Sequence, residues 1–121
     1  MTAPSLWRRI RNTFFNPRRR HIAAIDVTAD GFVLSLRARE KPMRWADVTQ
    51  IDAGVRDYLS YDALYVVMMA GAAAIEIQEL DDGFRLFEHA LVERWPHIRE
   101  VLNRLLVSTP HEPQHETLWR R

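Results

Sequence analysis

The spacing of apolar residues changes once along this chain. Apolar residues alternate with other residues at 21–39, and apolar runs short enough to be strands continue to residue 79. From Phe84 to Leu105 apolar residues recur every three or four positions. Alternation predicts strands, and the longer spacing predicts amphipathic helices. Strands in series followed by helices predict an α+β domain with an antiparallel, curled sheet of five or more strands packed on C-terminal helices.

Turn residues divide the first part of the chain into strands. Asp30-Gly31 is a strong signal for a short hairpin, and Gly71 separates two apolar runs. A further turn is predicted at residues 40–42, which end in Pro42. The predicted strands cover residues 21–28, 32–39, 45–53, 64–69 and 73–79.

Two C-terminal helices are predicted on either side of Pro96. Proline disfavours helix at the residue before it but suits the first turn of a new helix. Asp81 or Asp82 is the expected N-cap of the first helix. After the helices, the polar tail at residues 108–121 can close onto the sheet as an edge strand through Trp119. The predicted helices cover residues 83–94 and 97–106.

The first twenty residues carry six arginines and no acidic residue. The rest of the chain holds 11 of the 17 Lys and Arg and all 16 Asp and Glu, so a head of charge +6 precedes a body of charge −5. Residues 5–15 are predicted to form a short helix, which makes residues 1–20 a basic amphipathic arm on a domain at residues 21–107. The helix has an apolar stripe of Leu6, Trp7, Ile10 and Phe14, opposed by Arg8, Arg9, Arg11 and Asn12.

The apolar stripe of this arm needs a surface to cover it. Four surfaces are open to it: its own domain, an anionic membrane, a protein partner and nucleic acid. Nucleic acid is the least favoured, because the acidic body repels phosphates and no recognised reading module is present. Two tyrosines of a polar loop are further contact candidates. The candidate contact residues are Trp7, Arg8, Arg9, Arg11, Phe14, Arg18, Arg19, Arg20, Tyr58 and Tyr61.

Catalytic and metal-binding patterns are weak in this sequence. The chain has no cysteine and only four glycines, which disfavours thiolate chemistry and phosphate-cradling loops. His111-Glu112-Pro113-Gln114-His115 matches the HExxH spacing of zinc proteases, but Pro113 lies inside the turn that must be helical. We therefore assign no catalytic, cofactor-binding or metal-binding residue and expect a protein that is not an enzyme.

Two sets of carboxylates are expected at solvated positions. The first set recurs every five residues, a period that fits no single face of a helix or strand, and is expected at turns and strand edges. The second set forms an acidic corner and is expected on a strand exterior and at a helix start, where negative charge suits the helix dipole. The sets are Asp47, Asp52, Asp57 and Asp62, and Glu76, Glu79, Asp81 and Asp82.

Three motifs follow one another in the domain at residues 21–107. The opening hairpin is IDVTADGFVLSL, and a tryptophan-acid-valine step follows at Trp45-Ala46-Asp47-Val48. Paired apolar strands then end in the acidic corner EIQELDDGF before an amphipathic helix. Over about residues 22–106 the chain resembles bacterial pleckstrin-homology-like (PH-like) domains. It also resembles small uncharacterised bacterial proteins whose tail ends near TLWRR.

This resemblance implies a binding module and carries over no catalytic residue. We expect a non-enzymatic protein-binding module of PH-like type. One alternative is an immunity or antitoxin-like protein, whose acidic body covers the basic active site of a toxin. The other is a peripheral membrane protein attached through residues 5–20. A homodimer through an open edge strand or the stripe of the arm is also open.

The location expected from the sequence is the cytoplasm. The longest apolar run has 13 residues, 63–75, whereas a membrane span needs about 20. No apolar region of a signal peptide follows the arginine-rich start. If the arm binds lipid, we expect the protein at the inner face of the membrane.

Overall fold

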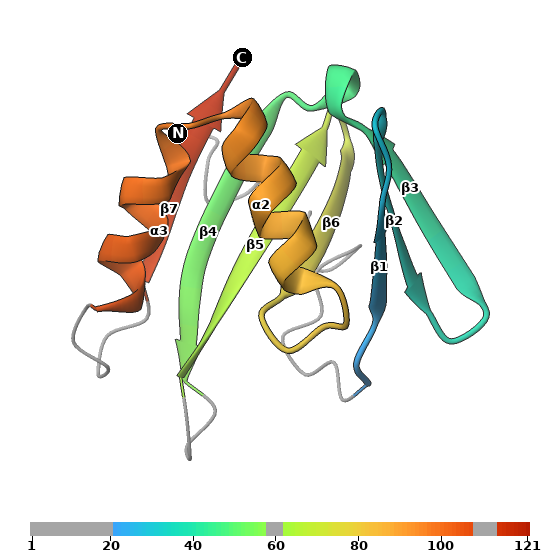
Figure 1. The fold of residues 1–121 in the computed structure, drawn as a ribbon, viewed down its shortest axis with the longest axis horizontal. Coiled ribbons are helices and arrows are strands. Elements are labelled where there is room, and N and C mark those ends of the chain that lie inside the picture. The colour runs from blue at the N-terminus through green and yellow to red at the C-terminus, as the bar shows by residue number, and fades with distance from the viewer. Residues whose placement is uncertain (1–20, 58–61, 108–113) are drawn as a thin grey trace.

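The computed structural model describes residues 21–57, 62–107 and 114–121. Within these ranges the strands form two antiparallel sheets, ordered β1-β2-β3 and β6-β5-β4-β7 (Figure 1). The strands are β1 (Ala24–Val27), β2 (Gly31–Leu36), β3 (Arg39–Arg44), β4 (Gln50–Asp57), β5 (Asp62–Ala70), β6 (Ala73–Gln78) and β7 (Gln114–Arg120). The helices are the 3₁₀ turn η1 (Trp45–Asp47), α2 (Phe84–Arg94) and α3 (Ile98–Leu106).

The α+β class, with antiparallel strands and two C-terminal helices, is confirmed. The strands are divided between a three-stranded and a four-stranded sheet, and these do not close into a barrel. The predicted helix at residues 5–15 lies outside the described residues. None of the described helices is long and apolar enough to cross a membrane.

β3 occupies the place where the sequence predicted a turn. Pro42 lies inside this strand, paired with Val33, and the β2–β3 turn comes earlier, with Arg37 at φ 58°. Proline is accepted because β3 is an edge strand, where the missing N–H can face away from the ladder. The prediction of a turn at residues 40–42 was therefore wrong.

Trp45 starts the crossover between the two sheets. It was predicted to open a strand at 45–53, but Trp45 begins η1 and β4 starts at Gln50. The backbone N–H of Trp45 donates to the Asp30 carbonyl oxygen at 2.9 Å, and the indole side chain is buried. Its ring lies 5.4 Å from Phe32 and 6.2 Å from Phe87, so it joins the first sheet to α2. Aromatic burial here outweighs the strand pattern.

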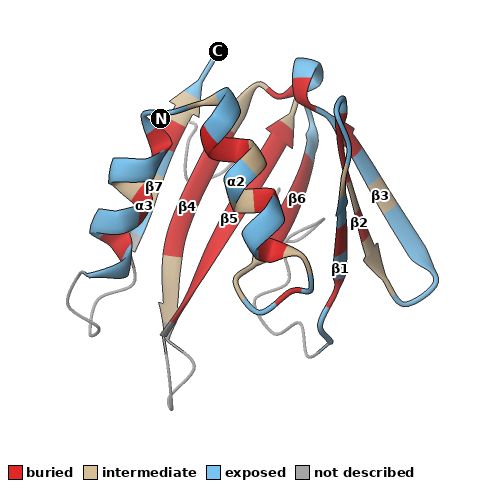
Figure 2. Cartoon of the chain, in the orientation of Figure 1, coloured by how far each residue is buried: buried red, intermediate tan, exposed pale blue. Residues whose placement is uncertain are grey.

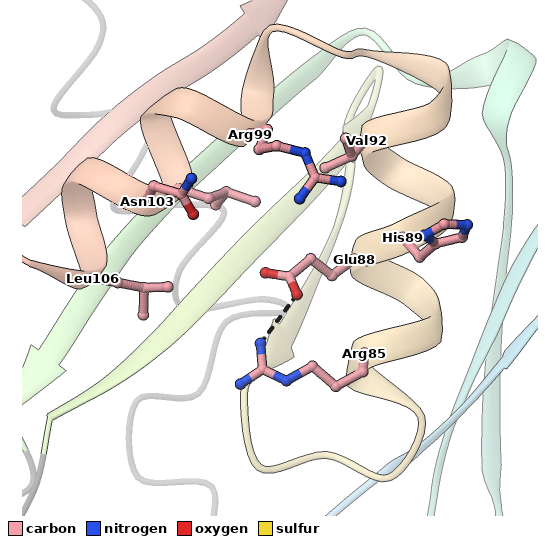
Figure 3. A pocket seen from close by; sticks show the side chains of 8 residues that line it. Arg85, Glu88, His89, Val92, Arg99, Asn103 and Leu106 are labelled. Carbon is pink, nitrogen blue, oxygen red and sulfur yellow. Dashed lines mark hydrogen bonds and ion pairs between the residues drawn. The ribbon is translucent and has the colours of Figure 1, made fainter.

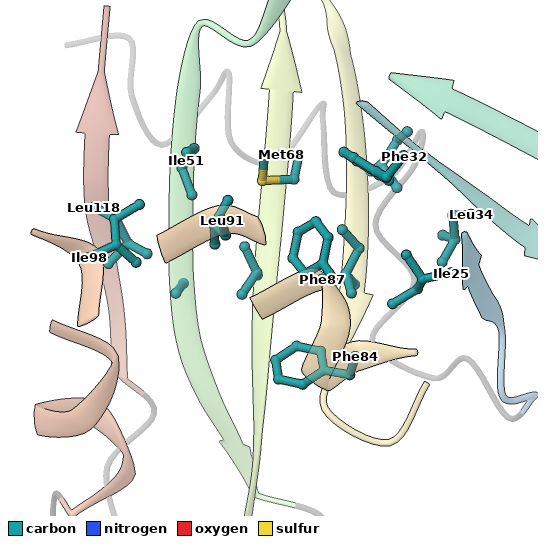
Figure 4. Packing of buried hydrophobic residues seen from close by; sticks show 14 of the residues in the cluster. Ile25, Phe32, Leu34, Ile51, Met68, Phe84, Phe87, Leu91, Ile98 and Leu118 are labelled. Carbon is teal, nitrogen blue, oxygen red and sulfur yellow. The ribbon is translucent and has the colours of Figure 1, made fainter. Parts of the chain in front are cut away.

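The main core lies between α2, α3 and the inner face of the four-stranded sheet, and extends under the first sheet (Figure 4). Ile51 of β4 and Met68 of β5 are fully buried, as are Phe87 and Leu91 of α2. Phe32 packs edge-on against Phe87 at 5.2 Å. Burial of each such side chain contributes about 1.5–3 kcal/mol.

The start of α2 differs from the prediction of an aspartate cap. The N-cap is Gly83, at φ 89°, and it makes no side-chain cap. Asp81 instead accepts hydrogen bonds from the Ala23 N–H at 3.0 Å and the Gln78 N–H at 2.8 Å. The expected role of Asp81 in capping was therefore wrong: this buried carboxylate ties the entry of β1 to the end of β6.

Candidate functional site

β1 is an edge strand whose outer edge is only partly paired. It pairs with β2 along its length, and its other edge meets the segment before α2. There the Ile25 N–H donates to the Asp82 carbonyl oxygen at 2.8 Å, and the Asp82 N–H donates to the Ala23 carbonyl oxygen at 2.9 Å. Because antiparallel pairing alternates, the backbone groups of Val27 point to this same edge. Within the described ranges, no backbone hydrogen bond to Val27 is found on that side.

Gly83 fixes the start of α2 against β1. A side chain at this position would bring a Cβ atom within 2.5 Å of the Ile25 carbonyl oxygen. Beyond this contact the helix axis turns toward the four-stranded sheet, and α2 and β1 diverge (Figure 1). A groove of about 830 Å³ opens between them.

This groove, which we call the β1–α2 groove, has an apolar floor and charged walls. Trp45 and Ile25 lie at its base, and Ala90 and Leu86 line the helix side. Leu86 is 70% exposed. The charged lining residues are Asp26, Glu93 and Arg94, and His89 lies beside them, 2.9 Å from Glu93. An exposed leucine beside an unpaired strand edge is suited to contact with another chain.

A polar network lies on the outer face of the four-stranded sheet. His115 contacts Asp52 through Nε2 at 2.9 Å and Tyr65 through Nδ1 at 2.9 Å. Because the carboxylate accepts from Nε2–H, the second ring nitrogen, Nδ1, is the one that shares a hydrogen bond with the Tyr65 hydroxyl. The amide of Gln50 donates to Asp52 at 2.8 Å. This network joins β4, β5 and β7, so we assign it a structural role.

Two sequence expectations are overturned on this face. Asp52 was expected at a solvated edge but is 3% exposed, and Glu76 was expected on a strand exterior but is 4% exposed. Glu76 forms an ion pair with Arg56 at 2.7 Å. Sequence reasoning missed both sites because a buried carboxylate is held by partners distant in sequence.

The HExxH match does not form a helical metal site. His115 lies in strand β7, and His111 falls outside the described residues. Among the residues that the structure describes, no group of three or more His, Asp and Glu could hold a metal ion.

A second recess lies between α2 and α3 (Figure 3). It measures about 260 Å³, with Arg99 and Asn103 of α3 facing Glu88 of α2. Arg85 at its rim bridges Glu88 at 3.0 Å and Glu79 at 3.3 Å. Because Arg85 and Glu88 of this recess already pair with each other, we place no site there.

The candidate contact residues from the sequence all lie outside the described residues. They are Trp7, Arg8, Arg9, Arg11, Phe14, Arg18, Arg19, Arg20, Tyr58 and Tyr61. The β1–α2 groove was not predicted, because its two walls are more than fifty residues apart. The available sequence signal for the groove was Leu86, an apolar residue on the side of α2 that does not face the core, where it is exposed.

Comparison of the chain with protein-family models, with curated proteins and with solved structures found no match.

Proposed function

We propose that this protein is a non-enzymatic protein-binding module that takes an extended segment of its partner as an added strand along β1. The observation that carries the proposal is the outward-facing backbone of Val27 at the β1–α2 groove. An exposed strand edge offers backbone donors and acceptors, and the pockets beside it select side chains. Backbone pairing supplies affinity and the groove supplies specificity.

The lining of the groove indicates which segment would fit. Alternate residues of an added strand would point toward Trp45, Ala90 and Leu86, so apolar side chains are favoured there. Asp26 and Glu93 at the rim favour a basic residue between the apolar ones. The preferred partner segment is extended, with apolar residues at every second position.

The proposal includes a PH-like reading of the fold. Two antiparallel sheets with α2 packed between them support that reading, as does the order of the hairpin, tryptophan step and acidic corner. Such a fold positions loops and edges for contact and needs no cofactor.

A proline substitution tests the proposal. Val27→Pro removes the outward N–H without removing a β1–β2 hydrogen bond, and proline is tolerated at strand edges. The full-length protein should select extended apolar peptides from a random peptide library. Val27→Pro should weaken binding of a selected peptide at least tenfold, which corresponds to about 1.4 kcal/mol.

The matched control is Glu40→Pro on β3, the other edge of the same sheet. Glu40 lies two residues before Pro42 in β3. Backbone groups two residues apart point to the same side of a strand, so the N–H of Glu40 also points away from β2. Peptide affinity should be unchanged in this variant. Equal peptide affinity for Val27→Pro and the wild-type protein would rule out strand addition at β1.

A further inference from the structure

Arg94 is a cation on the helix side of the β1–α2 groove. It lies in the last turn of α2 and lines the groove together with Leu86 and Ala90. Leu86 and Arg94 are both exposed, and Figure 2 shows exposed residues alternating with buried ones along α2. Arg85, the other arginine of this helix, is held by two glutamates, whereas Arg94 makes no ion pair with any residue that the structure describes. Arg94 is therefore open to an acidic group of a partner.

The groove changes from apolar to cationic along its length. α2 starts against Ile25, where Gly83 closes one end of the groove. At the other end Arg94 precedes Trp95, whose ring lies 6.2 Å from that of Trp45. A partner segment along β1 would thus meet the apolar lining near the closed end and the guanidinium at the open end.

The outward backbone groups of β1 favour an antiparallel partner strand. On the groove side, the Ile25 N–H is taken by the Asp82 carbonyl oxygen, and Gly83 covers the Ile25 carbonyl oxygen. In an antiparallel pair, a single residue opposite Val27 can donate one hydrogen bond to it and accept the other from it. A parallel strand needs two residues for the same two bonds, and the first of them would point its own N–H at the covered carbonyl of Ile25.

The partner residue opposite Val27 would point its side chain into the groove. Directly opposed residues of an antiparallel pair lie on one face, and Val27 packs against the main core. The next side chain of the partner on this face is two residues, or about 6.8 Å, away. Ala90 and Arg94 are one turn of α2 apart, which is about 6 Å. A partner residue that faces Ala90 therefore brings the residue two positions before it to Arg94.

The acidic residues that line the groove leave this contact to Arg94. Glu93 is paired with His89 at 2.9 Å. Asp26 is exposed between two inward residues of β1, so it lies on the outer side of the strand. The guanidinium of arginine presents N–H donors in a fork that matches the two oxygens of a carboxylate. An aspartate or glutamate of the partner is the side chain that suits this position.

We propose, on the basis of strand addition at β1, that Arg94 determines the specificity of the groove by binding an acidic side chain of the partner segment. From its N-terminus, this segment carries Asp or Glu, then any residue, then an apolar residue. The apolar residue lies opposite Val27 and faces Ala90, and the segment runs antiparallel to β1. Backbone pairing accepts any extended chain, so the acidic residue is what distinguishes one apolar segment from another.

Peptide selection with the full-length protein tests the role of Arg94. Peptides selected from a random library by the wild-type protein should share Asp or Glu two positions before an apolar residue. Peptides selected by Arg94→Glu should carry Lys or Arg at that position, because the charge that they meet is reversed. In calorimetric titration, replacing the acidic residue of one selected peptide with lysine should weaken binding to the wild-type protein about tenfold. The lysine peptide should bind Arg94→Glu about tenfold more tightly than it binds the wild-type protein.

The matched control is Arg99→Glu, which makes the same change of charge at an exposed arginine of α3, outside the groove. This variant should select the same peptides as the wild-type protein and bind them with unchanged affinity. Equal changes in Arg94→Glu and Arg99→Glu would indicate general charge attraction and would overturn the proposal.

Val27→Pro separates this proposal from strand addition itself. If Val27→Pro weakens peptide binding but Arg94→Glu retains the wild-type preference, the role of Arg94 is wrong and strand addition at β1 stands. An acidic residue two positions after the apolar one would indicate a parallel strand and would also overturn the proposal. Unchanged binding in Val27→Pro would remove strand addition at β1 and the role of Arg94 together.

Discussion

The two faces of the four-stranded sheet are buried by different kinds of side chain. The inner face is aliphatic and aromatic, and α2 and α3 cover it with complementary side chains such as Phe87 and Leu91. The outer face has a narrow apolar stripe among buried polar groups. There Asp52 pairs with His115 of the neighbouring strand β7, and Glu76 pairs with Arg56 of β4, across β5. The inner face provides most of the hydrophobic stability. The outer face depends on hydrogen bonds and ion pairs. Replacing one of its polar side chains with an apolar one leaves a buried partner without a hydrogen bond, so this face tolerates fewer such replacements.

The largest effect is expected from truncation on the inner side. Phe87→Ala removes a fully buried ring that contacts Phe32, Trp45 and Phe84. We expect a loss of about 3–5 kcal/mol in the free energy of unfolding. Urea denaturation followed by circular dichroism measures it. The matched outer-face variant, Val67→Ala, should lose about 2 kcal/mol. A greater loss for Val67→Ala would reverse the order of the two faces.

A smaller effect is expected from the ion pair of the outer face. Glu76→Ala leaves the Arg56 guanidinium, whose side chain is 15% exposed, without this carboxylate. Because the pair is withdrawn from water, we expect a loss of about 3 kcal/mol in the free energy of unfolding. Glu88→Ala removes the exposed pair with Arg85 and should cost less than about 1 kcal/mol. Equal losses in the two variants would show that the outer face is open to water.

The smallest effect is expected from the polar network. Tyr65→Phe deletes the hydroxyl that shares a hydrogen bond with His115 and retains the ring beneath the Arg56 guanidinium, which lies 4.4 Å from its centroid. We expect a loss of about 1 kcal/mol. A double-mutant cycle with His115→Ala isolates the hydrogen bond. Additive losses in the cycle would mean that the two side chains are not coupled.

The sequence was sufficient where local signals decide the structure. The turn that ends at Gly31 and both helices lie within a few residues of their predicted positions. Local signals misled where tertiary position decides. Pro42 resembles a turn residue but lies on a sheet edge, and Trp45 resembles a strand residue but turns to fill the core.

The candidate site was less accessible to prediction than the fold. His115 and Asp52 are 63 residues apart in sequence and meet only because β7 pairs with β4. The groove depends on the angle between α2 and β1, which is fixed by the close approach of Gly83 to Ile25. Periodicity identifies which residues are buried, but it does not identify which strands become edges.

β7 pairs with β4 although about sixty residues separate them, and it supplies Leu118 to the core. During synthesis the chain leaves the ribosome from its N-terminus, so β4 emerges well before its neighbour. Until β7 has been synthesised, that side of β4 is an unprotected template for pairing with other nascent chains. Completion of the sheet therefore waits for residues 114–120, and a polypeptide that stalls before residue 114 would expose an aggregation-prone edge.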